Sequence, residues 1–224
     1  MTRRNIVVIG AGGFGREALD IIEAINADTA HESWQILGVV DDRPSDLNLE
    51  RLYRRGIAYL GSSEEVRRAH PEAWYVVGIG SPVVRRRIAA DFDADGWHAA
   101  RLVHPRAVIG SVGEIGGGSV ICGGAQLSTN TRLGAHVHLN PGSIIGHDTV
   151  LEEFVSVNPG AVVSGEVVVR PGVLVGAGAV ILQGLTVGEG ATIGAAACVI
   201  HSVGAGQTMV GVPARILERG RERS

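Results

Sequence analysis

The sequence predicts an α/β domain followed by an all-β parallel β-helix, and three observations support this fold class. A glycine-rich turn separates an apolar run from a helical stripe near residue 10. An aliphatic residue recurs at every sixth position over residues 103–204. Charge divides the chain at the same place, because residues 1–102 hold 13 Arg and 15 acidic residues, whereas residues 103–204 hold three Arg and six acidic residues.

Residues 103–204 repeat with a period of six. Every sixth residue from Val103 to Val199 is Val, Ile or Leu, which makes 17 repeats without an insertion. A period of six matches neither a helix nor a simple strand, so it indicates short strands joined by tight corners. Three hexapeptides form one triangular coil of 18 residues, which predicts between five and six coils of a parallel β-helix. Residues 205–224 are expected to cap its open end.

Residues 1–102 are typical of a small Rossmann-like domain. The stretch NIVVIGAGGFGREALDIIEAI predicts a strand, a GxGxxG turn at Gly10, Gly12 and Gly15, and a helix that begins near Gly13. WQILGVVDD and WYVVGIGSP predict two further strands, and VVRRRIAADF begins another helix. Glycine and polar residues after parallel strands predict a ligand crevice at the carboxyl edge of the sheet.

This crevice is expected to hold the nucleotide part of an activated sugar. Free N–H groups at the helix start suit a phosphate, and Arg85, Arg86 and Arg87 offer either phosphate contacts or a solvated helix face. The domain is small for a dinucleotide, and its acidic pair lies further than the usual ~20 residues from the glycines, which disfavours an NAD-dependent dehydrogenase. A packing turn without a ligand is the alternative. The predicted substrate contacts are Gly12, Gly13, Asp41, Asp42, Gly80 and Ser81.

Composition excludes several function classes. The formal net charge of the 224 residues is −3, which gives no electrostatic basis for binding nucleic acid. Cys122 and Cys198 lack the spacing of a zinc motif or a disulfide scaffold, and the absence of lysine removes a Schiff-base anchor for pyridoxal phosphate. Neither a membrane-spanning run nor a secretory signal is present in the sequence, so we expect a cytoplasmic protein without membrane partners.

Within the apolar repeat, the stretch SIIGHDTV places a histidine and an aspartate side by side at His147 and Asp148. Neutral histidine, with a reference pKa of ~6.5, suits the removal of a proton from an acceptor near neutral pH. A neighbouring carboxylate fixes the tautomer and stabilises the imidazolium. Successive strand residues face opposite ways, so the two side chains cooperate only if they lie at a corner of the coil.

In the order of its parts, the chain resembles the bacterial sugar O-/N-acyltransferases with hexapeptide repeats, which include sialic acid O-acetyltransferases and UDP-4-amino-sugar N-acetyltransferases. The resemblance rests on the Rossmann-like domain, the unbroken repeat, NPGSIIGHD and the later VGVPAR. It implies a left-handed β-helix and direct acetyl transfer from acetyl-CoA, with His147 as general base and Asp148 as its orienting partner. Flat solenoid faces that are poor in charge favour a homotrimer.

The resemblance also implies contacts with the acetyl-CoA co-substrate. A backbone N–H one coil after the base would bind the oxyanion, and Gly165 lies 18 residues after His147. Ser156 replaces a family histidine near the thioester, so it either bonds the co-substrate or leaves that contact missing. Asn140 is an expected substrate contact, with an asparagine ladder to Asn158 as the alternative. The remaining expected co-substrate contacts are Ala177, Ala195 and Arg215, although Arg215 equally suits an exposed cap residue.

The predicted function is therefore acetyl transfer from acetyl-CoA to an amino group of a nucleotide-activated amino sugar. O-acetylation of a sugar such as a sialic acid is the alternative, because the sequence does not separate amine from hydroxyl acceptors. His136, His138 and His147 also suggest a zinc site between subunits, like that of the γ-class carbonic anhydrases, but such a site does not explain the N-terminal domain. A scaffold without activity is a third possibility. We expect no bound metal.

Overall fold

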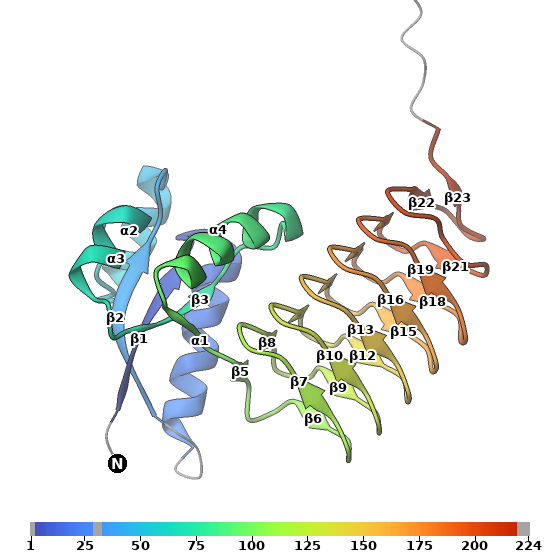
Figure 1. Cartoon of the computed structure of the whole chain (residues 1–224), viewed down its shortest axis with the longest axis horizontal. Helices are drawn as coiled ribbons and strands as arrows, with labels where there is room; N and C mark the ends of the chain where they lie inside the picture. The colour runs from blue at the N-terminus through green and yellow to red at the C-terminus, as the bar shows by residue number, and fades with distance from the viewer. Residues whose placement is uncertain (1–2, 29–32, 219–224) are drawn as a thin grey trace, which may run out of the picture.

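The computed structural model describes residues 3–28 and 33–218, and it contains an α/β unit followed by a long solenoid (Figure 1). Within the described residues, the α/β unit has a four-stranded parallel sheet in the order β2-β1-β3-β4. Because β1 pairs with β2 on one side and β3 on the other, its carboxyl end is a switch point at which such sheets bind ligands. The strands are β1 (Arg4–Ile9), β2 (Trp34–Val40), β3 (Trp74–Val77) and β4 (His98–Ala99).

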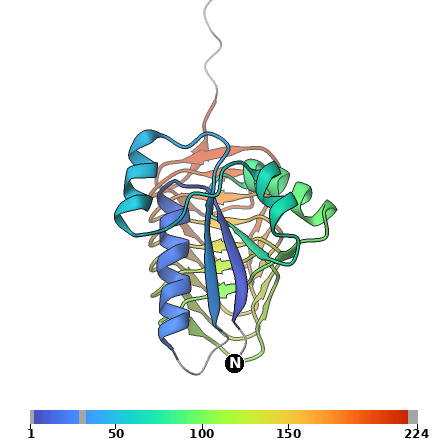
Figure 2. The same cartoon turned by 90° about the vertical axis from the view of Figure 1, so that its left-hand side faces the viewer.

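Helices cover both faces of this sheet (Figure 2). Helices α1 and α2 pack with Ile6 and Val8 of β1 on one face, whereas α3 and α4 pack with Val7 and Ile9 on the other face. This double burial explains why β1 is a continuous apolar run. The helices are α1 (Gly13–Ala27), α2 (Asp46–Arg54), α3 (Ser63–Ala69) and α4 (Pro82–Ala94).

Helices α1 and α4 confirm the sequence prediction, whereas α2 and α3 were not predicted. Both unpredicted helices are short and charged, and each buries a single residue, Leu52 in α2 and Val66 in α3. The sequence signal for these two helices is their N-caps: Ser45 caps α2, and Ser62 with Glu65 forms a capping box at α3. No helix within residues 3–28 and 33–218 combines the length and the apolar character needed to span a membrane.

The solenoid is a left-handed type of parallel β-helix, as predicted, and its two-residue strands stack into three sheets. One sheet contains β7 (Glu114–Ile115), β10 (Arg132–Leu133), β13 (Val150–Leu151), β16 (Val168–Val169) and β19 (Thr186–Val187). A second contains β5 (Leu102–Val103), β8 (Val120–Ile121), β11 (His138–Leu139), β14 (Ser156–Val157), β17 (Leu174–Val175) and β20 (Thr192–Ile193). The third contains β6 (Val108–Ile109), β9 (Gln126–Leu127), β12 (Ile144–Ile145), β15 (Val162–Val163), β18 (Val180–Ile181) and β21 (Cys198–Val199).

The strand register follows the 18-residue coil that the sequence predicts. Arg132 pairs with Val150, for example, and the aliphatic residue of nearly every hexapeptide is buried in the central core. The spacing shortens in the last coil, where Ile193 pairs with Met209. There β22 (Thr208–Val210) pairs antiparallel with β23 (Arg215–Ile216), and the nearby Ala214 packs against the core.

Arg85 of α4 joins the two parts of the molecule. Its side chain is completely buried, and its guanidinium donates hydrogen bonds to carbonyl oxygens on both sides. The acceptors are Ile79 at 2.9 Å and Gly80 at 3.2 Å in the α/β unit, and His136 at 3.0 Å and Phe154 at 2.8 Å in the solenoid. Burial lowers the pKa of Arg85 to about 9. Neither a phosphate contact nor a solvated face describes this residue; it is an anchor between domains.

Two histidines are buried at the same interface. The ring of His136 stacks on Phe154 with a centroid distance of 5.0 Å, and the ring of His138 lies 4.6 Å from that of Phe14. Neither nitrogen of His138 has a hydrogen-bond partner within the described residues. Burial lowers the pKa of both side chains, that of His136 to about 4, so both rings are neutral at pH 7.

Candidate active site

The predicted catalytic pair meets at a corner of the β-helix between β12 and β13. Asp148 turns this corner with a φ of +58°, a left-handed conformation that non-glycine residues seldom adopt. The turn brings the two side chains together, so that His147 Nδ1 lies 2.7 Å from Asp148 Oδ2. Because a carboxylate only accepts hydrogen bonds, Nδ1 carries the hydrogen, and the lone pair of Nε2 remains free.

Asn130 completes the support of this pair. It lies one coil earlier in the same corner column, and its Nδ2 donates to Asp148 Oδ1 at 2.5 Å. The hydrogen bonds from Asn130 and then from His147 hold the pKa of Asp148 below its usual range. Asp148 is therefore a carboxylate with both oxygens engaged. The sequence analysis missed Asn130, although its spacing of 18 residues from Asp148 was a usable signal.

Gly165, one coil after His147, lies directly against the imidazole. A Cβ added to Gly165 would be 2.6 Å from His147 Nε2, so a larger residue would displace the ring. The N–H of Gly165 has no hydrogen-bond partner among residues 3–28 and 33–218. This backbone N–H, predicted as the oxyanion donor, is therefore an available donor beside the free nitrogen of the histidine.

Glu166 is a further carboxylate at this corner that the sequence analysis did not single out. It lies one coil after Asp148, has a φ of +60°, and donates its backbone N–H to His147 O at 2.8 Å. One side-chain atom each of His147, Asp148 and Glu166 lies within 4.8 Å of the others, and all three residues are exposed. In the described part of the chain, the Glu166 carboxylate forms neither a hydrogen bond nor an ion pair.

The histidine set that suggested a shared zinc site is not assembled in this chain. His136 is 3% exposed and His138 is 1% exposed, because the α/β unit covers both. His147 lies on the open surface at another corner, with 57% of its side chain exposed. Two of the three histidines therefore cannot reach a metal held on the solenoid surface.

The residues predicted to contact acetyl-CoA lie in different environments. Ala177 and Ala195 are exposed in one corner column, and Arg215 is exposed in β23. Ser156 is only 1% exposed, and its hydroxyl donates to Gly80 O at 3.0 Å and accepts from Arg85 Nη2 at 2.9 Å. Ser156 thus belongs to the domain interface, which leaves it no surface for a co-substrate.

Asn140 forms the ladder that was the alternative to a substrate contact. Its Nδ2 donates to Val157 O at 3.1 Å and lies 3.4 Å from Asn158 Oδ1, one coil later. The side chain is half-buried. This ladder uses the amide nitrogen of Asn140 and leaves its amide oxygen without a hydrogen-bond partner in the described residues.

The glycines of the turn between β1 and α1 have separate roles. Gly10 has a φ of +106°, and a Cβ added to Gly15 would lie 1.8 Å from Gly10 O, so these two residues allow the turn and the close packing of helix on strand. A Cβ added to Gly12 or Gly13 would meet nothing within 4 Å. No side chain caps α1, so open backbone N–H groups face the crevice there.

Asp41 and Asp42 lie at the same sheet edge, after β2, but their carboxylates are bound by the protein. Asp41 Oδ2 accepts the N–H of Ala11 at 2.8 Å, and Asp42 Oδ1 accepts the N–H of Ser63 at 2.8 Å. These bonds hold the glycine-rich turn and the start of α3. Both residues therefore shape the crevice, whatever they contact in addition.

Gly80 and Ser81 follow β3 and complete this edge. Gly80 is exposed, and Ser81 accepts the N–H of Val84 at 3.5 Å as the N-cap of α4. The six residues predicted to contact the nucleotide are thus gathered at the carboxyl ends of β1, β2 and β3, on the surface of the α/β unit.

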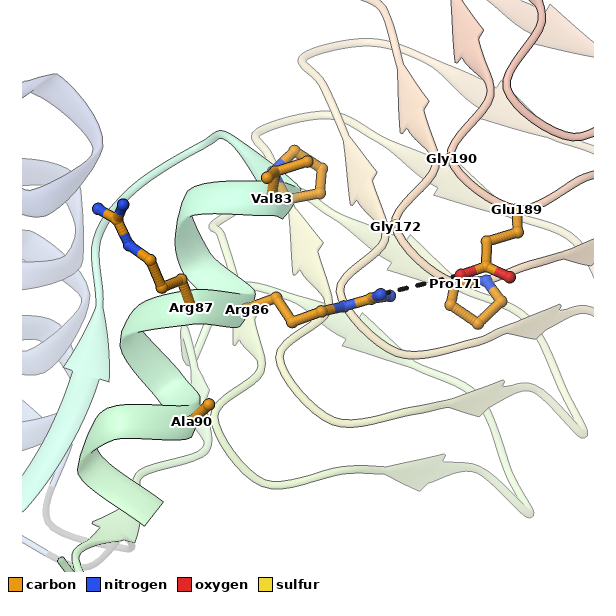
Figure 3. Close-up of a pocket in the computed structure, with 9 residues that line it drawn as sticks. Val83, Arg86, Arg87, Ala90, Pro171, Gly172, Glu189 and Gly190 are labelled. Atoms are coloured by element: carbon orange, nitrogen blue, oxygen red, sulfur yellow. Dashed lines mark ion pairs between the residues drawn. The ribbon is translucent and has the colours of Figure 1, made fainter. Parts of the chain in front are cut away.

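A cavity of about 320 Å³ lies between α4 and the solenoid corners that carry Pro171 and Glu189 (Figure 3). Arg86 reaches across it toward Glu189, with 3.8 Å between the charged atoms, and its guanidinium lies 5.2 Å from the ring centroid of Phe154. Arg87 points away from the solenoid (Figure 3). The arginine run thus gives one buried anchor, one residue paired across the interface and one on the open face.

Comparison with known proteins finds similarity in both parts of the chain. Residues 5–92 match the family described as PglD N-terminal domain. GDP-perosamine N-acetyltransferase of Escherichia coli O157:H7 is 30% identical over 141 residues, which cover 63% of this chain and 61% of that protein. UDP-N-acetylbacillosamine N-acetyltransferase of Bacillus subtilis (strain 168) is 30% identical over 118 residues, which cover 53% and 51%. The chain thus spans less than two thirds of the length of these curated relatives.

A solved structure matches the whole architecture. The acetyltransferase domain of PglB from Neisseria gonorrhoeae FA1090 has a TM-score of 0.85 and 29% identity, over 96% of this chain and 100% of that domain. The same domain in complex with acetyl coenzyme A has a TM-score of 0.84. The resemblance to sugar acyltransferases predicted from the sequence is confirmed. The N-terminal part of the chain is similar to the PglD N-terminal domain family, and the whole chain shares the fold of these sugar acetyltransferases.

Proposed function

We propose that the chain transfers the acetyl group of acetyl-CoA to an amino group of a nucleotide-activated amino sugar. The observation that carries this proposal is the corner geometry: His147 Nδ1 is held by Asp148 at 2.7 Å, and Nε2 is free beside Gly165. The names of the two curated relatives, which are N-acetyltransferases of GDP-perosamine and UDP-N-acetylbacillosamine, support an amino acceptor. The PglB domain bound to acetyl coenzyme A supports the donor.

In the proposed reaction, His147 acts as the general base. The acceptor nitrogen attacks the thioester carbonyl carbon while Nε2 removes a proton from that nitrogen, which typically contributes ~10²–10⁴-fold. Asp148 accepts the Nδ1–H bond and stabilises the imidazolium that forms. The N–H of Gly165 donates to the carbonyl oxygen as that oxygen becomes negative. The carbon–sulfur bond then breaks, and the imidazolium returns its proton to the thiolate of CoA.

Direct transfer fits the buried thiol better than a covalent acyl-enzyme does. Cys122 is 3% exposed, and burial raises the pKa of its thiol to about 12. A thiol of this kind is neither ionised nor accessible at neutral pH, and the thiolate is the nucleophilic form. The proposal therefore places acceptor and acetyl-CoA in the site together.

The two ligands are assigned to different surfaces. We place the pantetheine arm of acetyl-CoA along the coils after the base, near Gly165 and the separate corner column of Ala177 and Ala195, with Arg215 near a phosphate. The nucleotide occupies the crevice of the α/β unit, where Gly12 and the start of α1 face solvent. Asn140 offers its free amide oxygen to the sugar. A homotrimer would supply the second wall of the solenoid groove, and a solution mass of three chains tests it.

The function is tested by ligand binding and turnover together. Thermal unfolding is measured with acetyl-CoA, with UDP-, GDP- and dTDP-linked amino sugars, with NAD and with zinc, and thiol release from acetyl-CoA follows each acceptor. A ligand at ~100 times its dissociation constant adds ~2.7 kcal/mol to the free energy of unfolding. We expect acetyl-CoA and one nucleotide amino sugar to stabilise the protein and to react. Stabilisation by zinc or NAD, without any response to acetyl-CoA, contradicts the proposal.

A further inference from the structure

The active-site corner holds two carboxylates in different states. Both oxygens of Asp148 are engaged, one by Asn130 and one by His147. Glu166 is one coil away, within 4.8 Å of the imidazole by its side-chain atoms, and no protein donor in the described residues binds its carboxylate. Asp148 therefore binds the histidine, whereas the Glu166 carboxylate lies beside the imidazole without a protein partner in the described residues.

We infer that Glu166 binds the acceptor nitrogen and selects amino over hydroxyl acceptors, an inference that rests on the proposed function. A carboxylate attracts an ammonium group, the common form of an alkyl amine at neutral pH, since reference amines have pKa values of ~8–10. Glu166 would accept one N–H bond from this group and hold it beside Nε2 of His147. A charged hydrogen bond of this type is about twice as strong as a neutral one.

The hydrogen count of the acceptor explains the selectivity. The ammonium first loses one proton to water. The neutral amine then has two hydrogens, one donated to His147 Nε2 and one to Glu166, while its lone pair faces the thioester carbon. His147 takes the second proton as the carbon–nitrogen bond forms. A hydroxyl has a single hydrogen, so once that hydrogen points at Nε2, an oxygen lone pair faces the Glu166 carboxylate and is repelled.

The fold does not require a glutamate at this position. Glu166 has a φ of +60°, where a residue without Cβ is less strained, and Gly184 occupies the same column one coil later with a φ of +70°. Glu166 also lacks an arginine or histidine partner that would give it a structural ion pair within the described residues. Neither the backbone nor an ion pair in the described residues therefore accounts for a glutamate at this corner.

The test compares two nucleotide-sugar acceptors that differ only in an amino or a hydroxyl group at the reacting carbon. For Glu166→Gln we expect KM for the amino acceptor to rise about tenfold, and the amine-to-hydroxyl ratio of kcat/KM to fall at least as much. Glu166→Asp, which keeps the charge, should recover part of this ratio. Glu153→Gln is the matched control, since Glu153 is an exposed solenoid glutamate at another corner, and we expect no change.

Each outcome has a defined meaning. An unchanged ratio in Glu166→Gln, or an equal fall in kcat for both acceptors, overturns the assignment of Glu166. Glu166→Gly guards against misfolding, because glycine suits this backbone, and it must lose the amine preference without a fall in Tm. Absence of thiol release by the wild type with every amino acceptor contradicts the proposed function itself, and with it this inference.

Discussion

Histidines on neighbouring coils of the solenoid occupy opposite environments. His147 stands on an exposed corner with a carboxylate at 2.7 Å, whereas His138 is 1% exposed and has no hydrogen-bond partner in the described residues. At the corner, Asp148 and Glu166 have a left-handed backbone and exposed side chains, and the Glu166 carboxylate has no partner in the described residues. At the interface, the His138 ring is buried against Phe14 of α1, and Arg85 of α4 bonds the carbonyl oxygens of His136 and Phe154. The difference teaches that neighbouring coils keep one histidine open to solvent, where the proposed reaction needs it, and bury another in the interface between the two parts of the molecule.

The largest expected effect on stability is at the interface anchor. Arg85→Met removes donors from buried carbonyl oxygens in both domains, and we expect a loss of about 3 kcal/mol in the free energy of unfolding, measured in urea. Arg87→Met, on the exposed side of the same helix, should change it by less than about 0.5 kcal/mol. Equal losses in the two variants would show that Arg85 is not an anchor.

At the candidate active-site corner, Asp148→Asn should lower kcat by about 10²–10⁴-fold. The amide can donate to Nδ1, which moves the imidazole hydrogen to Nε2 and removes the base. Asparagine tolerates the left-handed backbone of residue 148, so Tm should stay within about 2 °C of the wild type. Steady-state kinetics beside thermal unfolding tests this, and a stable variant with full kcat speaks against the role of Asp148.

As the pH falls, the free energy of unfolding should decrease through the two buried histidines of the interface before carboxylates are protonated. Burial places the folded pKa of His136 and His138 below the unfolded value of ~6.5, so the unfolded chain binds more protons as the pH falls. Stability is therefore lost as the pH falls below 6.5, down to about 4 for His136 and further for His138, by at most ~1.4 kcal/mol per pH unit for each histidine. His138→Phe should flatten the slope between pH 6.5 and 5 in urea titrations. A slope equal to that of the wild type is the contrary result.

Gly165→Ala should displace the imidazole of His147 and lower activity while leaving the stability of the fold unchanged. The added Cβ would lie 2.6 Å from His147 Nε2, and the ring can move away, so we expect about tenfold lower kcat/KM with little change in Tm. Gly113→Ala is the matched control, because its Cβ would meet its nearest atom at an ordinary 3.7 Å. Unchanged kinetics in Gly165→Ala would mean that the ring position is unimportant.

The smallest expected effect compares two corners of the solenoid. Gly142, at a φ of +70°, lies at a glycine corner, and Gly142→Ala should cost about 1 kcal/mol of stability. Glu166→Gly makes the reverse change at a φ of +60° and should keep or raise Tm. Differential scanning calorimetry measures whether each substitution lowers or raises Tm. A destabilised Glu166→Gly would assign Glu166 a structural role.

The sequence predicts the solenoid in detail because its core is one-dimensional. Each hexapeptide contacts the same neighbours, so a period of six specifies strands, corners and the 18-residue register. The same arithmetic places Gly165 beside His147 and a corner at Asp148, as the structure shows. Columns one coil before and after Asp148 would also have found Asn130 and Glu166.

The domain interface could not be predicted in this way. Arg85, Ser156 and His138 have polar side chains in ordinary repeat or helix positions, and their burial follows only from the docking of the α/β unit, through α1 and α4, on the second solenoid sheet. No spacing in the chain encodes that contact, since its partners are about 50 to 70 residues apart. The hydrogen bonds of Asp41 to Ala11 and of Asp42 to Ser63 also join residues that are distant in the sequence, so they could not be predicted from spacing either.

The central claim is that His147 is the base for an amino acceptor, and its most direct test is acetyl transfer by His147→Ala. Thiol release from acetyl-CoA is followed with the amino sugar nucleotide that binds best, for the variant and the wild type at equal Tm. We expect kcat to fall by about 10²–10⁴-fold while acetyl-CoA still stabilises the protein. Turnover by His147→Ala at the wild-type rate would contradict the account.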